Sequence, residues 1–425
     1  MTRSGATMNP SLQPTATIDA GLRGGNLHAW RRARRKAAVQ ALLLALPLLV
    51  FLLATFVAPI ASLLARSVQN PEVRGSMPQL TAALRAWDGS GVPGEAAFAA
   101  LAQGLRQSAE SGDLGNVARR MNFYQPEFRS LLMKTARETR SQTPDVWKPT
   151  LIGIDPRWGE HETWRLLQRA AVSPTPDYLL NAVDAQVSPD GSVTSVPADS
   201  AIYRAAFVRT IQVSAVVTLL CLLLGYPVAY LLATLPAKQS NRLMLFVIVP
   251  FWTSLLVRTT AWYVLLQPGG VINTALLRFG IVHHPVPLIF NRTGVLIGMT
   301  HILLPYMILA IYSVMKSVSP VYVRAAQSLG AHPVTAFVRV YIPQTLPGVG
   351  AGCFLVFVLA LGYYITPALL GGAGDEMISQ LIAMQTNEQL NWGLAGALSC
   401  YLVIFTAIFY FVFNRLVGID RLRFG

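Results

Sequence analysis

Few residues of this chain have both the type and the spacing that covalent, metal or nucleotide chemistry requires. His283 and His284 are adjacent, but no Cys, Asp or Glu lies near them at a metal-ligand spacing, which favours an ordinary loop. No lysine follows a glycine, so the glycine-rich loop that binds nucleotide phosphates is absent. Cys221, Cys353 and Cys400 all lie in apolar segments, which excludes a disulfide framework. We therefore predict no catalytic residue and no metal site.

The polar and aromatic residues with a potential role lie within or beside apolar stretches. Arg258 interrupts the apolar stretch 243–266. An arginine at the centre of a membrane helix costs about 2.5–3.5 kcal/mol and is functional by default, but near a membrane surface it also serves as an interfacial anchor. For Arg258 the interfacial role is the favoured alternative. The candidates for lining a solute path are six residues, Trp252, Thr253, Arg258, Trp262, Tyr363 and Tyr364.

The elements that position these residues are predicted to be membrane helices. Hydrophobic residues make up 53% of the 425 residues and charged residues only 13%, against about 25% charged residues in soluble domains. Long uncharged stretches exceed the roughly 20 residues that a membrane helix needs. These stretches are 37–65, 210–237, 293–315, 340–374 and 389–414, and 243–266 is counted with them. The sequence thus predicts an all-α membrane protein with six transmembrane helices.

The net charge of +14 belongs to the membrane part of the chain. The segment 66–204 carries 15 basic and 15 acidic residues, and the remainder carries 19 basic and 5 acidic residues. Basic residues beside hydrophobic spans determine topology, so we exclude a nucleic-acid partner. A basic cluster at 31–36 precedes the first span, which is too long for the core of a cleaved signal peptide. Alternation of basic loops then predicts cytoplasmic N- and C-termini, with Arg278 and Arg292 as exceptions.

This topology divides the chain into four parts. They are a cytoplasmic basic tail (1–36), a first transmembrane helix (37–65), an extracytoplasmic insertion (66–204) and a core with five further helices (205–425). The insertion is long enough for its own hydrophobic core, and apolar residues at helical spacing predict that it is mostly helical. It is either a spacer or a docking surface for an extracytoplasmic partner. Its basic cluster between Arg119 and Arg140 is a contact patch or a solvated helix face.

The cytoplasmic loop 319–343 has the signals of a helix, a turn and a second helix. Ser319 suits an N-cap, Pro320 suits the first helical position, and Gly330 suits the left-handed residue after a helix end. Two later prolines are expected to bend the chain toward the next span. Ala325 and Ala326 form a small, smooth patch, which allows another protein to approach the backbone closely.

The spacing within this loop resembles the signature of ATP-binding-cassette importer permeases, which is E-A-A, three residues, G, nine residues, then I-x-L-P. The matching positions are Arg324, Ala325, Ala326, Gly330, Val340, Ile342 and Pro343. The resemblance implies that 319–330 is a coupling helix, which docks in a groove of the ATPase subunit. Arg324 departs from the family, which usually has Glu there, and reverses the charge offered to the ATPase.

Further motifs resemble the spermidine/putrescine type of these permeases. They are G-Y-P-V-A-Y at 225–230, P-F-W-T-S-L-L-V-R-T-T-A-W at 250–262, L-P-Y-M-I-L at 304–309 and T-P-A-L-L-G-G at 366–372. The resemblance implies the type I importer permease fold in the inner membrane of a bacterium. It also implies several partners, namely two ATPase subunits that bind ATP and magnesium, a second permease that completes a heterodimer, a periplasmic solute-binding protein and membrane lipid. No cofactor is expected in this chain.

The implied function is ATP-driven import of polyamines or of a related small organic cation. The spans contain no Asp or Glu, so we expect selection by the binding protein and a low-affinity path through the permease. One alternative is the same architecture for another solute, such as a phosphonate, an opine or an amino-acid derivative. A less favoured alternative is a membrane sensor or scaffold that has lost coupling because of Arg324.

Overall fold

The computed structural model describes residues 20–188, 192–197 and 201–417 and divides after Ser62 into two compact units. In the first unit, α1 (Ala20–Leu52) continues through a π-helical turn (Leu53–Val57) into α2 (Ala58–Ala65). The run Lys36–Val68 is long and apolar enough to cross a membrane. Its apolar side chains are exposed on all sides, which is typical of a membrane span. Residues 1–19 of the predicted basic tail lie outside the described residues.

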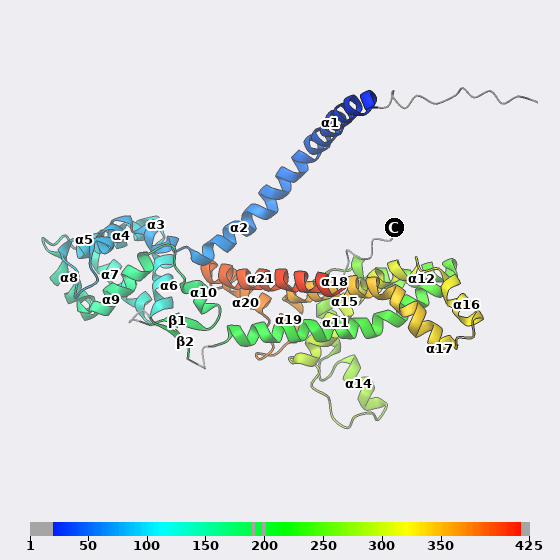
Figure 1. Ribbon diagram of the computed structural model, residues 1–425. Coiled ribbons are helices and arrows are strands. Elements are labelled where there is room, and N and C mark those ends of the chain that lie inside the picture. The colour runs from blue at the N-terminus through cyan, green and yellow to red at the C-terminus, as the bar shows by residue number, and fades with distance from the viewer. Residues whose placement is uncertain (1–19, 189–191, 198–200, 418–425) are drawn as a thin grey trace, which may run out of the picture. The chain divides into compact units, whose positions relative to one another are not determined.

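Four further helical runs of the described residues are long and apolar enough to span a membrane. They contain α11 (Tyr203–Thr234), α15 (Arg292–Met315), α18 (Ile342–Leu361) and α21 (Trp392–Val417). The helices α11, α15 and α18 pack against one another and bury a shared apolar cluster (Figure 1). Close approach of α18 to α15 depends on small residues, because a Cβ on Gly352 would lie 2.7 Å from Sδ of Met307.

The predicted third span, 243–266, is not one straight helix. Its chain forms α12 (Ala237–Ile248), a 3₁₀ turn (Val249–Trp252) and α13 (Leu255–Leu265), with a bend of 97° between the two apolar halves. Pro250 lies in the 3₁₀ turn, and Thr253 and Ser254 after it have extended backbones. Proline removes a helical donor and two extended residues end the helix, so the chain turns sharply there. Within residues 20–188, 192–197 and 201–417, five helical runs are therefore long and apolar enough to be spans, and six if the bent pair counts as one.

Shorter helices connect the spans. They are α14 (Val271–Arg278), α16 (Pro320–Ser328), α17 (Pro333–Ala336), a π-helical turn (Phe337–Tyr341), α19 (Ile365–Leu370) and α20 (Ile378–Asn387). Two prolines were predicted to bend the chain between α17 and the next span. The structure instead continues helically from Pro333 to Leu361. Pro343 has no backbone N–H to donate to the preceding helical turn. The π-helical turn Phe337–Tyr341, which ends two residues before Pro343, is wider than an α-helical turn and leaves room for this proline.

The insertion folds as a helical domain with its own core. Its elements are α3 (Pro71–Ser76), α4 (Pro78–Ala86), α5 (Glu95–Ser111), α6 (Leu114–Tyr124), α7 (Phe128–Thr139), α8 (Trp147–Ile154), a 3₁₀ turn (Pro156–Gly159), α9 (His161–Ala171) and α10 (Asp177–Asn181). Two short antiparallel strands follow, β1 (Ala185–Val187) and β2 (Val193–Ser195), in the register Ala185↔Ser195 and Val187↔Val193. The mostly helical character agrees with the prediction, although the two strands were not predicted.

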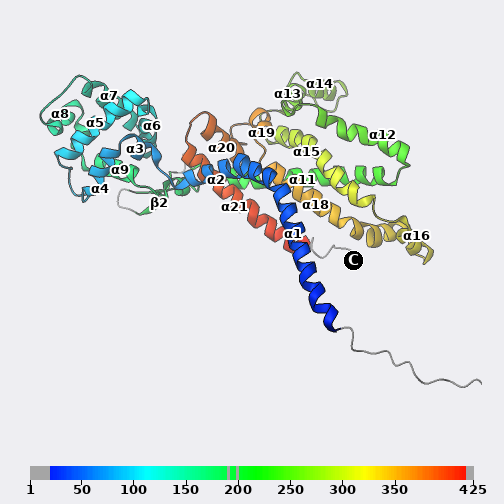
Figure 2. The same ribbon diagram turned by 90° about the horizontal axis from the view of Figure 1, so that it is seen from above.

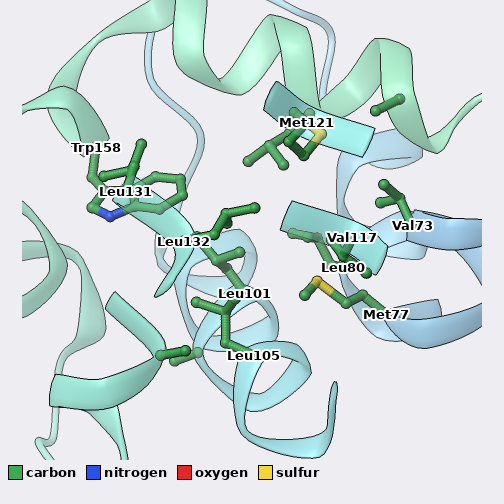
Figure 3. Close-up of a cluster of buried hydrophobic side chains, with 14 of the residues drawn as sticks. Val73, Met77, Leu80, Leu101, Leu105, Val117, Met121, Leu131, Leu132 and Trp158 are labelled. Atoms are coloured by element: carbon green, nitrogen blue, oxygen red, sulfur yellow. The ribbon is translucent and has the colours of Figure 1, made fainter. Parts of the chain in front are cut away.

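Large apolar side chains fill this domain (Figure 3). Trp158 and Trp164 are fully buried. Their indole N–H groups are satisfied, because Trp158 donates to Oγ1 of Thr135 at 2.9 Å and Trp164 donates to the carbonyl of Trp158 at 2.8 Å. The insertion therefore has an apolar core in which the indole N–H groups of both buried tryptophans have hydrogen-bond acceptors. This is expected of a domain with its own hydrophobic core.

The insertion is fixed to the first turns of two spans. The carboxylate of Asp184 accepts hydrogen bonds from the backbone N–H groups of Tyr203 and Arg204 at 3.0 and 2.7 Å, at the beginning of α11. Tyr178 on α10 is buried in a cluster that includes Leu394 and Leu398 of α21. A Cβ on Gly393 would lie 2.3 Å from the Tyr178 ring, so only glycine allows this contact.

Replacing Gly393 by alanine is expected to loosen the insertion from α21. The added methyl group overlaps the buried Tyr178 ring, and overpacking of this kind costs about 1–3 kcal/mol. The measurement is limited proteolysis and thermal unfolding of the purified full-length protein. Gly374→Ala is the matched control, because nothing lies within 4 Å of its Cβ position. Equal behaviour of the two variants would contradict the contact, and Gly393→Ala should cost less in a Tyr178→Ala background than in the wild type.

Candidate functional site

The predicted coupling segment begins with a capped helix. The helix α16 starts after Ser319, whose Oγ accepts a hydrogen bond from the backbone N–H of Val321 at 3.3 Å. Pro320 occupies the first turn, where its missing N–H leaves no helical bond unmade. The structure confirms the N-cap and the first-turn proline that the sequence predicts.

A Schellman motif ends the same helix. Gly330 has a φ of +91°, in the left-handed region that favours glycine. Its N–H donates to the carbonyl of Gln327 at 2.9 Å, and the N–H of Ala331 donates to the carbonyl of Ala326 at 3.0 Å. The direction in which the chain leaves α16 thus depends on Gly330, which also confirms the prediction for this residue.

The outer surface of α16 has no intramolecular cover. No residue of the helix is buried, and Tyr322, Arg324 and Ala325 are exposed. Leu329 is 90% accessible. Exposed apolar groups beside small residues and a charge are typical of a protein contact surface. Among the described residues, Arg324 forms no ion pair, so its charge is available to a partner.

Aromatic contacts connect this surface to the spans. Val323 of α16 packs against the cluster shared by α11, α15 and α18. Phe337 stacks on Tyr341 with ring centres 5.5 Å apart, and both rings contact Tyr230 of α11 edge-on. Tyr341 is buried. Packed side chains, rather than a loose linker, therefore join α16 to α11 and α18. Pro343, the last signature residue, lies in the first turn of α18.

Two of the six path candidates lie at the bend of the third span. Trp252 is 76% accessible, and Thr253 is exposed in the extended segment after it. The hydroxyl of Thr253 donates a hydrogen bond to the carbonyl of Pro250 at 2.8 Å, within the same turn. The bend separates these two residues from Arg258 and Trp262, so the sequence stretch 250–262 does not form one continuous helical face.

Arg258 and Trp262 lie on α13, beyond the bend. The Nε and Nη1 atoms of Arg258 are buried and have no hydrogen-bond partner among the described residues. Arg258 interacts electrostatically with His301 and Tyr363. The Trp262 ring contacts the His301 ring edge-on at 5.4 Å. An interfacial anchor keeps its guanidinium solvated, whereas Nε and Nη1 of Arg258 are buried, so the structure does not support the interfacial role over the alternative of lining a path.

Tyr363 and Tyr364 lie in the break between α18 and α19 rather than within a continuous span. The carbonyl of Tyr363 accepts a hydrogen bond from Oγ of Ser379 at 2.6 Å, and Tyr364 is exposed. The fold therefore distributes the six candidates over three places: Trp252 and Thr253 at the bend, Arg258 and Trp262 on α13, and Tyr363 and Tyr364 in the break after α18.

The sequence analysis missed the packing that positions α13 and α19. The buried hydroxyls of Thr259 and Thr366 lie 3.4 Å apart and form a hydrogen bond between these helices. A Cβ on Gly298 of α15 would lie 2.9 Å from Cγ2 of Thr366, so a glycine is needed beneath α19. Thr366 belongs to the motif 366–372, but its partners Thr259 and Gly298 lie more than sixty positions earlier in the sequence. Their contact with Thr366 depends on the tertiary structure.

The basic cluster of the insertion does not form one solvated face. Arg119, Arg137 and Arg140 are exposed, whereas Arg120 is buried. Lys134 forms an ion pair with Asp155 at 3.5 Å. A contact patch made of the whole cluster is therefore excluded, because one of its charges is directed into the protein.

Comparison with known proteins identifies the region that holds α16 and the path candidates. Residues 205–419 match the family described as "Binding-protein-dependent transport system inner membrane component". The spermidine/putrescine transport system permease protein PotB of Escherichia coli (strain K12) is 35% identical over 214 residues, which cover 50% of this chain and 78% of that protein. PotB of Haemophilus influenzae is 34% identical, with 50% and 75% covered.

More distant similarities involve transporters of other solutes. The molybdenum transport system permease protein ModB of Mycobacterium bovis is 27% identical over 206 residues, covering 48% of this chain and 76% of that protein. A chain in the crystal structure of a bacterial ABC transporter involved in the import of the acidic polysaccharide alginate is 17% identical, with a TM-score of 0.43 and 52% and 80% covered. The family match over half of this chain, together with the identity to PotB, shows that the chain belongs to the inner-membrane components of binding-protein-dependent transport systems.

Proposed function

We propose that this chain carries polyamines across the bacterial inner membrane as a permease subunit of an ATP-driven importer. Its family consists of transport components rather than enzymes, and the ATPase of such importers is a separate subunit. The observation that carries the polyamine proposal is the identity of 35% over 214 residues to permeases of spermidine and putrescine. A solute-binding protein outside and an ATPase inside are the partners that this family implies.

The chemistry of the spans supports a path of low affinity. Residues 205–374 contain no Asp or Glu, and Arg258 places a cation on α13. A polyamine is a flexible polycation that binds tightly to carboxylates and aromatic faces. The spans therefore lack the carboxylates that tight binding needs, and the separate binding protein selects the solute.

Uptake of labelled solute tests this proposal. The complete complex in vesicles, with loaded binding protein outside and ATP inside, is expected to accumulate labelled putrescine or spermidine and to lose this uptake without ATP. Accumulation of a labelled phosphonate or amino-acid derivative, but not of polyamines, would overturn the assignment of the solute. The assignment as a subunit of an ATP-driven importer would remain valid. Absence of ATP-dependent uptake of every solute, in a complex that hydrolyses ATP, would favour the sensor or scaffold alternative.

We further propose that α16 lies on the cytoplasmic side together with both chain termini, and that the insertion is periplasmic. Figures 1 and 2 support this orientation, because α16 and the insertion helices lie at opposite ends of the bundle of α11, α15 and α18. Two ATPase copies and a second permease complete the transporter. When the ATPases close, α16 moves with them and the spans change from inward to outward access.

Arg324 sets the charge of the proposed ATPase contact. Because Arg324 is exposed and forms no ion pair among the described residues, we propose that the ATPase groove of this system offers it an acidic group. Arg324→Glu is expected to weaken ATPase binding about tenfold through like-charge repulsion, without changing the stability of the permease.

The affinity of the purified ATPase for the detergent-solubilised permease, at low and high salt, measures this effect. Arg242→Glu is the matched control, since Arg242 is also exposed and lies on α12, outside the coupling segment. Tighter binding of the Arg324→Glu variant would show that the groove is basic, as the family's usual Glu implies, and would overturn the proposal.

A further inference from the structure

A groove of about 380 Å³ lies between α11 and α21, next to the insertion. Its lining includes Arg204, Phe207 and Ile211 of α11 and Tyr401, Ile404 and Ile408 of α21. The lining residues span seven positions on each helix, which gives the groove a length of about 10 Å along the spans. The transport mechanism proposed above uses none of these residues.

The groove begins beside the contact that joins the two helices. Near the insertion, α11 and α21 share a buried cluster, and the rings of Phe207 and Tyr401 contact edge-on with centroids 6.4 Å apart. Farther from the insertion along α21, Ile404 and Ile408 are exposed. The groove is therefore an open apolar surface that a molecule in the membrane can enter.

Arg204 is the one charged residue of the lining. It is exposed, and its guanidinium forms no hydrogen bond or ion pair with any residue of 20–188, 192–197 or 201–417. The carboxylate of Asp184 accepts the backbone N–H groups of Tyr203 and Arg204 and does not line the groove. A ligand can therefore reach the guanidinium of Arg204 without displacing a partner.

The position of Arg204 on α11 corresponds to the level of lipid headgroups. The helix has 32 residues and is about 48 Å long, whereas the hydrocarbon core of a bilayer is about 30 Å thick. The first turn of α11, which contains Arg204, therefore extends beyond the hydrocarbon core, and Ile211 lies deeper. Tyr401 is compatible with the same boundary, because its ring lines the groove and its hydroxyl donates to the carbonyl of Leu179 at 3.2 Å.

The single charge of the groove narrows the ligand class. An apolar lining alone selects no particular lipid, because all lipid tails are similarly apolar. A cation at the headgroup level attracts a phosphate, and no acidic side chain of the lining attracts the ammonium or choline group of a zwitterionic headgroup. The same charge disfavours a polycation such as a polyamine.

We propose that this groove binds an acyl chain of an anionic phospholipid whose phosphate accepts hydrogen bonds from Arg204. The chain lies along Ile211, Ile404 and Ile408. Ala182 and Val183 of the insertion line the same groove, so the bound lipid contacts the insertion and both spans. The proposal requires only that α11 and α21 span the membrane, and it is independent of the transported solute.

Binding of defined lipids to the purified full-length protein tests the headgroup. Phosphatidylglycerol, which is anionic, and phosphatidylcholine, which is zwitterionic, are added with identical acyl chains to delipidated protein in detergent. Native mass spectrometry measures the bound lipid, and the thermal unfolding midpoint is a second readout. We expect phosphatidylglycerol to bind about fivefold more tightly, the factor that one arginine near an anionic headgroup contributes. Equal binding of the two lipids would overturn the anionic assignment.

Replacing Arg204 by glutamine tests the charge contact. Arg204→Gln is expected to bind phosphatidylglycerol no more tightly than phosphatidylcholine. Arg278→Gln is the matched control, because Arg278 is exposed on α14, forms no ion pair among the described residues and does not line the groove. An unchanged preference in Arg204→Gln would overturn the role of this residue.

Filling the groove tests the site of the acyl chain. Ile404→Trp places a larger side chain in the groove and is expected to weaken binding of both lipids about fivefold. Val403→Trp is the matched control, because Val403 is also exposed on α21 but does not line the groove. Equal lipid binding in these two variants would overturn the groove as the binding site.

Photo-crosslinking in the complete transporter identifies what covers the groove in native membranes. The variant Ile404→p-benzoyl-phenylalanine carries a light-activated group at this position, and mass spectrometry identifies the molecule that it captures. We expect a phospholipid adduct. An adduct to protein in its place would show that a protein segment covers the groove and would overturn the proposal.

Discussion

Replacing Gly330 by valine is expected to abolish ATP-driven uptake while the permease remains folded and inserted. Gly330 holds a φ of +91° at the end of α16, and a β-branched residue there costs about 1–3 kcal/mol of backbone strain. The chain relieves this strain by giving up the Schellman hydrogen bonds of Gly330 and Ala331. The helix then no longer presents Tyr322, Arg324 and Leu329 in one orientation, so ATPase closure is not transmitted.

The measurement is ATP-dependent uptake in vesicles together with the ATPase rate of the assembled complex. Gly112→Val is a closely matched control, because Gly112 has a φ of +84° and, like Gly330, nothing lies within 4 Å of its Cβ position. Its strain is similar, but it lies at the end of α5 in the insertion. Uptake should fall at least tenfold for Gly330→Val and remain near wild type for Gly112→Val. Equal loss in both variants would indicate general destabilisation and would refute a specific coupling role.

Replacing Asp177 by asparagine is expected to destabilise the insertion by about 3–5 kcal/mol, the cost of breaking a buried ion pair. The carboxylate of Asp177 is 2% accessible and accepts hydrogen bonds from Arg169 and from the Tyr124 hydroxyl, the latter at 2.7 Å. Arg120 lies 3.9 Å away and is also buried. The amide removes the negative charge that compensates both arginines, so one buried cation remains unpaired.

Tryptophan fluorescence during denaturant unfolding of the full-length protein measures this loss, since the buried Trp158 and Trp164 report on the core of the insertion. Asp145→Asn is the control, because Asp145 is exposed and forms no ion pair among the described residues. A difference below about 1 kcal/mol between the two variants, the value typical of exposed pairs, would contradict the buried network.

The stability difference between wild type and Asp177→Asn is expected to depend on pH. Burial raises the pKa of Asp177, but hydrogen bonds from Arg169 and Tyr124 outweigh burial and lower this pKa below its ordinary value of 3.8. Because the folded-state pKa is depressed, the contribution of Asp177 to stability is complete above pH 3.8 and is lost as the pH falls through the folded-state pKa. The stability difference between wild type and Asp177→Asn should therefore be constant near neutrality and shrink below that pH.

Local sequence signals were sufficient for the elements whose determinants are close in the chain. Uncharged stretches predicted the spans, because every backbone group within a membrane must be satisfied internally and about 20 apolar residues do this as a helix. Ser319, Pro320 and Gly330 predicted both ends of α16, since capping and left-handed turns involve neighbouring residues only. The third span was the exception, because Pro250 and the extended residues after it bend an apolar stretch that composition alone presents as continuous.

The environment of single charged residues was decided by tertiary structure. Arg119 and Arg120 are neighbours in the sequence, yet one is exposed and the other is enclosed by Tyr124, Tyr178 and Asp177. Helical periodicity indicates which face is apolar, but it does not identify the residues that will cover that face.

The sequence by itself therefore determined the apolar spans and both ends of α16, because hydrophobic length and turn chemistry act over a few residues, and the resemblance of its motifs to importer permeases implied the transport role. Only the tertiary structure decided that two nitrogens of Arg258 are buried, that Tyr178 packs against Gly393, and that an apolar groove forms between α11 and α21. Each of these features joins residues far apart in the chain, and their contact depends on how whole helices pack.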